Sequence, residues 1–136
     1  MNYKMTDLKG IDQYLAAKLK AAGIETTSEM MNAWLDPVRR AQVAASSGLS
    51  EEQFKRMVSL ARMARMEGVG PRYAELLVTA GVIGTNSLSK HTPEALVKHL
   101  EEVSAAQHLS GPIPTIGEVG AWFEQLTSAR GPGAGS

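Results

Sequence analysis

The feature that most constrains this chain is an internal repeat at an offset of 58 positions. Residues 8–24 overlay residues 66–82 with the same order of apolar, small and glycine residues. The identical positions pair Gly10, Ala16, Leu19, Ala22 and Gly23 with Gly68, Ala74, Leu77, Ala80 and Gly81. A unit of roughly 60 residues buries too little apolar surface to be stable alone. We therefore expect two similar units, about 4–66 and 66–130, to pack as a pseudo-symmetric pair within one domain, residues 1–130.

Helix-start chemistry, with few alternating β-branched runs, predicts an all-α fold. Three hydroxyl residues have a Glu or Gln three positions later, which is the spacing of a capping box. Two further starts place a cap residue before proline. The capping boxes are Thr26/Glu29, Ser50/Gln53 and Thr115/Glu118, and the proline starts are Asp36-Pro37 and Thr92-Pro93. The expected helices cover residues 27–34, 37–46, 50–66, 85–90, 93–107 and 115–129.

Glycines and apolar spacing predict the helix ends and the core. Gly23 and Gly81 each follow an apolar helical pattern, where a left-handed residue ends a helix. Apolar residues at helical spacing predict buried stripes. The stripes are Phe54, Met57, Val58 and Ala61, then Ile116, Val119, Phe123 and Leu126. Met30, Met31, Met57, Met63, Met66, Trp34 and Trp122 fit core packing better than an adaptable binding surface.

Composition narrows the classes of protein further. The chain has 136 residues, no cysteine, and 14 basic against 14 acidic residues. Disulfides and thiolate metal sites are excluded, and the zero net charge counts against a general polyanion binder. No long apolar run or charged-then-apolar leader is present, so we expect a cytoplasmic protein without membrane contact. Residues 131–136 are small and glycine-rich, as in a flexible tail or an expression remnant.

The segment with the most chemical content is residues 66–77. Two glycines, Gly68 and Gly70, flank Val69 and permit a tight turn, while Val69 is expected to fix that turn to the core. Pro71 then begins a helix, whose unpaired N–H groups at Gly70, Arg72 and Tyr73 are expected to face an anion.

This segment resembles the helix-hairpin-helix (HhH) motif, a Gly-apolar-Gly turn followed by an alanine and an apolar pair, here Ala74 and Leu76-Leu77. The resemblance implies a hairpin that grips DNA phosphates without reading bases. Over roughly residues 4–130 the chain resembles an uncharacterised bacterial family of tandem HhH proteins of unknown function. That resemblance implies a fold more firmly than it implies a biochemical function.

The two copies of the hairpin differ in charge. Asp12 stands where the second glycine of the first hairpin belongs, so we interpret that copy as structural and Asp12 as a helix cap. Residues 53–72 hold five basic residues and one acidic residue, a net +4, beside the second hairpin. Helical spacing places Lys55, Arg62 and Arg65 within about a quarter turn. These three side chains either support phosphate binding or simply solvate the outer face of a helix.

No catalytic or metal-binding group of residues stands out. The spacing of His91, His99 and His108 predicts separate surface histidines, and no cysteine or carboxylate pattern completes a metal site. Adjacent Glu101 and Glu102 point apart on a helix. We therefore expect no enzyme activity, no cofactor and no metal.

Two functions remain open. The first, slightly favoured, is a module that binds nucleic acid weakly and without sequence specificity through Gly68, Val69, Gly70, Arg72 and Tyr73, with Lys55, Arg62 and Arg65 in support. The second is a protein-interaction adaptor or homo-oligomeric scaffold, whose partner is another protein or a second copy of the chain. Contacts with about three phosphates correspond to a slope near −3 when the logarithm of affinity is plotted against the logarithm of salt concentration. So few contacts predict weak binding.

Overall fold

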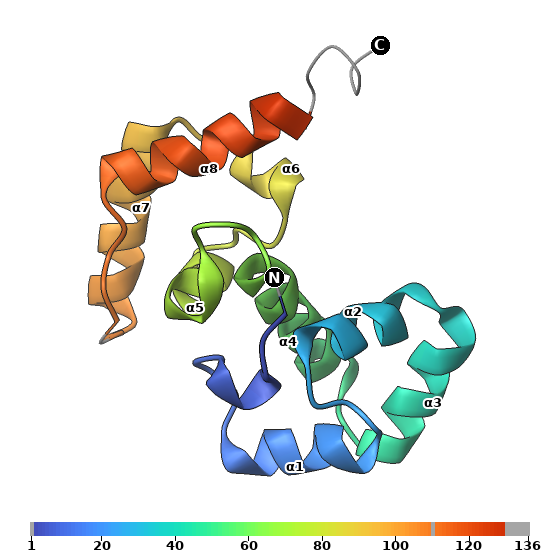
Figure 1. Ribbon diagram of the computed structural model, residues 1–136. Coiled ribbons are helices and arrows are strands. Elements are labelled where there is room, and N and C mark those ends of the chain that lie inside the picture. Colours follow the sequence, from blue (N-terminus) through green and yellow to red (C-terminus); the bar gives the residue numbers. More distant parts are fainter. Residues whose placement is uncertain (1, 110, 130–136) are drawn as a thin grey trace.

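The computed structural model describes residues 2–109 and 111–129, and this part of the chain is helical (Figure 1). Its only β-type pairing is an isolated bridge between Lys4 and Thr26. The elements are the 3-10 helix η1 (Met5–Asp7), α1 (Gln13–Ala21), α2 (Thr27–Leu35), α3 (Pro37–Ser47), α4 (Glu51–Ala64), α5 (Gly70–Thr79), α6 (Thr85–Leu88), α7 (Pro93–Ala106) and α8 (Ile116–Ala129). The predicted all-α class is confirmed.

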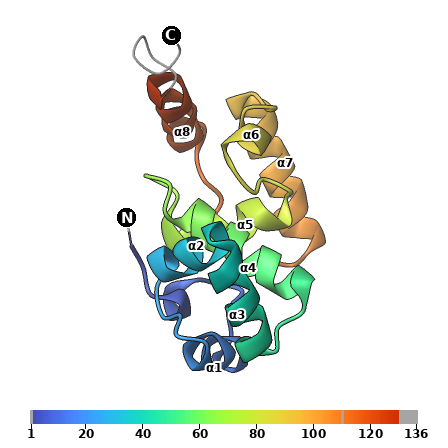
Figure 2. The same ribbon diagram turned by 90° about the vertical axis from the view of Figure 1, so that its right-hand side faces the viewer.

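Helices α4 and α5 form the middle of the molecule. Figures 1 and 2 show α1, α2 and α3 on one side of them and α6, α7 and α8 on the other. Helix α4 packs along α5 and also against α2. Residues around the whole circumference of its second half are buried, among them Leu60, Ala61, Met63 and Ala64. Both sides of the molecule therefore share α4 as part of their core.

The predicted helix starts are confirmed in detail. In both the Thr26/Glu29 and Ser50/Gln53 boxes the cap hydroxyl and the longer side chain make reciprocal bonds to the backbone. Asp36 accepts hydrogen bonds from the N–H groups of Val38 and Arg39. Further caps come from Thr92 to Ala95 N–H, and from the mutual bonds of Thr115 and Glu118. Local polar chemistry thus sets where these helices begin.

The ends of α1 and α5 share one hydrogen-bond pattern. Gly23 and Gly81 have φ of 83° and 89°, in the left-handed region. The N–H of Ile24 reaches the carbonyl of Leu19 at 2.9 Å, and that of Val82 reaches Leu77 at 2.8 Å. This is the Schellman arrangement, which satisfies the last free carbonyls of a helix. The local geometry therefore recurs at the sequence offset of 58.

The resemblance between the two sides extends to a side chain of the third helix. Arg39 on α3 donates to the carbonyl of Ala22 at 3.0 Å, and His99 on α7 contacts the equivalent carbonyl of Ala80 at 2.9 Å. The sides differ at their beginnings, since α4 precedes the second hairpin but only η1 precedes the first. Within the described residues, α1 is therefore preceded only by the short helix η1, whereas α5 is preceded by the long helix α4.

The stripe predicted on α8 is confirmed at Val119 and Leu126 and wrong at Ile116. Ile116 is 52% exposed, and the inward face of α8 is formed by Val119, Trp122 and Leu126. The reason is that Trp122, at 1% exposure, packs toward the second hairpin and sets the rotation of the helix. Phe123 is only partly buried.

Among the described helices, none combines the length and apolar character needed to cross a membrane. The predicted tail at residues 131–136 lies outside the described residues.

Candidate functional site

The second hairpin connects α4 to α5 through a tight glycine turn. Gly68 has φ of 84° and Gly70 has φ of 63°, so both adopt the left-handed backbone that the sequence predicted. Between them, the N–H of Val69 donates to the carbonyl of Met66 at 3.0 Å. Helix α5 begins at Gly70 and, within the described residues, no side chain caps its first turn. The turn is thus formed, but one of its amides is already used.

Helix α8 packs directly on this turn. The rings of Trp122 and Tyr73 lie 5.7 Å apart, centroid to centroid. A Cβ atom at Gly68 would lie 3.1 Å from Nε1 of Trp122, so the absence of a side chain permits the close approach. The side-chain amide of Gln125 donates to the carbonyl of Glu67. The glycine turn is therefore part of the surface against which α8 packs.

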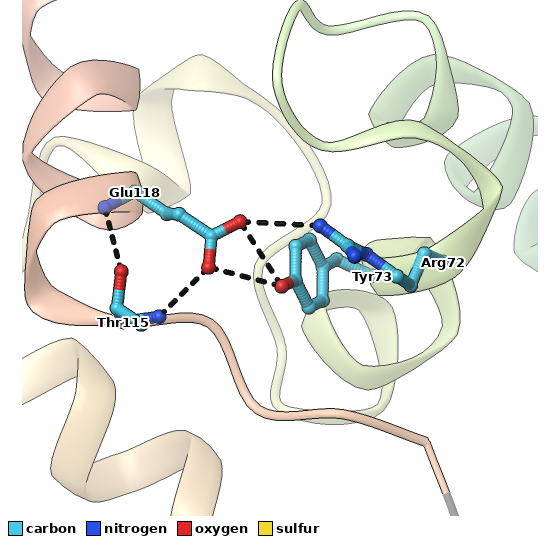
Figure 3. Close-up of polar contacts among 4 residues, drawn as sticks. All are labelled: Arg72, Tyr73, Thr115 and Glu118. Atoms are coloured by element: carbon cyan, nitrogen blue, oxygen red, sulfur yellow. Dashed lines mark hydrogen bonds and ion pairs between the residues drawn. The ribbon is translucent and has the colours of Figure 1, made fainter.

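A polar network joins the start of α8 to the start of α5 (Figure 3). Arg72 Nη2 lies 3.2 Å from Glu118 Oε2, and the hydroxyl of Tyr73 donates to the same carboxylate at 3.0 Å. The N–H of Thr115 donates to Glu118 Oε1 at 3.1 Å, while Thr115 Oγ1 accepts from the Glu118 N–H. A carboxylate of the chain itself therefore neutralises the cation nearest the hairpin.

Two pKa values reflect this network. The N–H of Thr115 holds the pKa of Glu118 below its ordinary value, and Tyr73 and Arg72 act in the same direction against some desolvation. Burial raises the pKa of Tyr73, and its hydrogen bond to Glu118 adds to that rise. Glu118 is therefore the ionised member of the pair and Tyr73 the neutral donor.

One of the predicted phosphate ligands, Val69, has its N–H already bonded within the turn. Val69 is 3% exposed and its N–H is bonded to Met66, so it cannot donate to an external anion. The side chain of Tyr73 is 2% exposed and its hydroxyl is engaged by Glu118, while the role expected for its backbone N–H stays a prediction. Gly68 is exposed and Gly70 partly so. Of the three turn residues 68–70, only the two glycines therefore have backbone exposed to solvent.

The predicted basic cluster is divided between separate places. Arg62 and Arg65 line one hollow beside Gly84, and Arg62 also donates to the carbonyl of Ile83 at 3.1 Å. Lys55 lies in another hollow, on α4 beside Trp34, and its ammonium is 3.0 Å from Glu51. Because ten residues of helix span about 15 Å, Lys55 does not extend the surface formed by Arg65. Helical spacing predicted a common direction but not a common site.

In the first hairpin, Asp12 acts as the helix cap that the sequence indicated. Asp12 Oδ1 accepts from the N–H of Leu15 at 2.8 Å and caps α1. A Cβ atom at Gly10 would lie 2.9 Å from the carboxylate of Glu75 on α5. The interpretation of Asp12 as a cap is confirmed, and a carboxylate of the second half lies beside this turn.

The comparisons with known proteins identify a family whose function is unknown. Residues 9–128 match the family described as Domain of unknown function (DUF4332). The chain belongs to this family. No curated protein and no solved structure matches it. The DUF4332 match covers all eight α-helices of the described residues at least in part.

The prediction of separate histidines is wrong for one pair. The rings of His91 and His99 stack with centroids 5.9 Å apart, because His91 precedes α7 and is not on a shared helix with His99. Within the described residues no group of three potential metal ligands comes together.

The contacts of Glu118, Trp122 and Gln125 with the second hairpin were not predicted. The capping box identified Glu118 as a cap, but no local pattern indicates its distant partners, which are 45 and 46 positions away.

Proposed function

We propose that this DUF4332 domain is a non-catalytic protein-binding scaffold whose second HhH hairpin anchors its own last helix. The observation that carries the proposal is the contact of Glu118 with both Arg72 and Tyr73, together with Trp122 beneath Gly68. Two side chains at the predicted phosphate site, those of Arg72 and Tyr73, are here engaged by Glu118 of α8. The two pseudo-symmetric HhH units then form a rigid frame for surfaces elsewhere.

Exposed apolar side chains at the junction of α2 and α3 support this proposal. Leu35 is 70% exposed and Val38 is 68% exposed. Next to them a hollow of about 580 Å³ is lined by Trp34, Phe54 and other residues of α2, α3 and α4. Large exposed apolar side chains beside a hollow that contains aromatic rings and charged residues are typical of surfaces that contact another protein.

Affinity purification with the full chain tests the scaffold proposal. We expect specific partners to be recovered with the natural sequence and lost with the double variant Leu35→Asp and Val38→Asp. The matched control exchanges exposed polar residues on α7, Glu101→Lys and Glu102→Lys, and should keep the partners. Identical recovery with both double variants, combined with a strictly monomeric state in light scattering, would contradict the proposal.

A second candidate function is weak, non-specific nucleic-acid binding by the same hairpin. It is favoured by the exposure of Gly68 and Arg65 and by the uncapped first turn of α5. Fluorescence anisotropy with labelled duplex and single-stranded DNA at about 50 and about 200 mM salt tests it. Binding that weakens with salt and is lost on both Arg65→Glu and Arg72→Glu would favour this function over the scaffold. No binding at the lower salt concentration would remove it.

A further inference from the structure

A groove lies between η1 and the outer face of α1. Its volume is about 480 Å³, and most of its lining is apolar. Met5, Ala16, Ala17 and Ile24 contribute to its walls, and the exposed side chains of Lys4 and Lys20 also border it. We call this the α1 groove.

The second half of the chain shows what can fill such a place. At the offset of 58, Ala16 and Lys20 on α1 correspond to Ala74 and Val78 on α5. Ala74 is 1% exposed and Val78 is 7% exposed, in a helix along which α4 packs. In the first half Ala16 is only half-buried and Lys20 is exposed. The corresponding face is therefore buried on α5 in the second half and largely exposed on α1 in the first half.

The segment before η1 does not cover the α1 groove as α4 covers α5. It is extended, with Lys4 bridged to Thr26 and the carbonyl of Tyr3 accepting from the N–H of Thr27 at 2.8 Å. This pairing directs the chain along residues 24–27 instead of continuing η1 backward as a helix. The groove consequently stays open along α1.

Charge around the groove indicates the chemistry of its occupant. On α4, Arg56 donates to Thr79 at the end of α5 at 3.2 Å. The position equivalent to Thr79 is Ala21, which has no hydrogen-bond acceptor on its side chain, and the flexible side chain of Lys20 borders the groove, so a cation on the occupant would lie near another cation. Glu25 is 3.9 Å from the Lys20 ammonium, but both side chains are largely exposed, so this pair is weak. A carboxylate on the occupant would complement Lys20.

We propose that the α1 groove binds one amphipathic helix of a separate protein, placed as α4 is placed on α5 and carrying a carboxylate where α4 has Arg56. This inference rests on the proposed scaffold function and names the class of ligand for one of its surfaces. Apolar side chains of the helix would lie over Ala16 and Ala17, and helix-in-groove binding of this kind is a common mode of recognition.

Peptides from the chain itself provide the probe. We would titrate the full chain into a fluorescein-labelled, end-capped peptide of residues 50–64, once with the natural sequence and once with Arg56→Glu, and measure anisotropy. We expect the glutamate peptide to bind about threefold to fivefold more tightly, as for an exposed ion pair. Lys20→Glu in the protein should reverse that order.

Two tryptophan substitutions locate the binding. Ala17→Trp fills the α1 groove from an exposed helical position and should abolish peptide binding. Ala121→Trp is the matched control, because Ala121 is also exposed on a helix, and its helix α8 lies on the other side of α4 and α5 from α1. Circular dichroism verifies that both variants fold.

The proposal is overturned if neither peptide binds at about millimolar protein, or if Ala17→Trp leaves binding unchanged. Loss of partners on Leu35→Asp and Val38→Asp with no effect of Ala17→Trp would leave the scaffold function standing and reject the groove. If the Leu35→Asp and Val38→Asp variant keeps its partners and the Ala17→Trp variant keeps peptide binding, both the scaffold function and the groove are rejected.

Discussion

Glu118 links the cap of one helix to the first turn of another. Its carboxylate accepts from the N–H of Thr115 and the hydroxyl of Tyr73, and it pairs with Arg72. Its side chain is 34% exposed, so water competes for the same oxygens. The contribution to stability should therefore be modest and dependent on the charge of this one residue.

The first prediction concerns the pH dependence of that contribution. Because the pKa of Glu118 is lowered in the folded state, its stabilisation is complete above the unfolded pKa and is lost as pH falls through the folded pKa. Glu118→Gln should lower the free energy of unfolding by about 0.5–1 kcal/mol near neutral pH. The difference should vanish at strongly acidic pH. Urea unfolding across a pH series measures both.

Glu124→Gln is the control for this series, since Glu124 is exposed on the same helix. It should change the free energy of unfolding little at any pH. A loss for Glu118→Gln that persists unchanged into acid would mean that the carboxylate charge is not what stabilises the contact.

A second prediction at this scale separates backbone conformation from space. Gly81 has φ of 89° with no atom within 4 Å of a Cβ, so Gly81→Ala costs only backbone strain, about 1 kcal/mol. Gly120 is also free of neighbours within 4 Å but lies inside α8. Gly120→Ala should instead stabilise the protein by about 0.5–1 kcal/mol. Thermal unfolding of the two variants should shift in opposite directions, and equal shifts would contradict the assignment of strain.

At the scale of elements, α8 is held by a face that combines Trp122 with Val119 and Leu126 of the predicted stripe and leaves out Ile116. The third prediction follows: Trp122→Ala should cost about 3–5 kcal/mol, because a ring at 1% exposure leaves a cavity beneath the hairpin. Ile116→Ala, at a position 52% exposed, should cost less than about 0.5 kcal/mol. Chemical denaturation of both variants decides which face of α8 is buried, and a larger loss at Ile116 would reject the observed rotation.

The helix boundaries could be predicted because capping is local. Thr26, Ser50 and Thr115 bond within three residues of themselves, so the sequence contains both partners. The same holds for the turns at Gly23 and Gly81, whose bonds span five residues or fewer.

The rotation of α8 could not be predicted in this way. Two apolar stripes share Val119 and Leu126, and only the distant contact of Trp122 with Tyr73 selects between them. The predicted grouping of the basic side chains failed for a related reason. Helical spacing gave the direction of Lys55, but its pairing with Glu51 and its distance along α4 from Arg65 decide what it does.

For the whole molecule, the decisive feature is that the two halves share α4. Helix α2 of the first half and α5 of the second both pack against it. Met57, Leu60 and Met63 on α4 are each at most 2% exposed. Separating the halves would expose these side chains, at a cost of roughly 1.5–3 kcal/mol for each fully buried residue. Neither half should therefore unfold while the other stays folded.

Two tryptophans allow the last prediction to be tested within intact chains. Trp34 lies in the first half, 5.5 Å from the ring of Phe54, and Trp122 lies in the second. Trp122→Phe leaves Trp34 as the reporter, and Trp34→Phe leaves Trp122. In each variant the urea transition seen by fluorescence should coincide with the transition seen by far-UV circular dichroism, because shared burial of α4 makes unfolding two-state. A fluorescence midpoint displaced from the circular dichroism midpoint in either variant would show that the halves unfold separately, and α4 would then belong to one half alone.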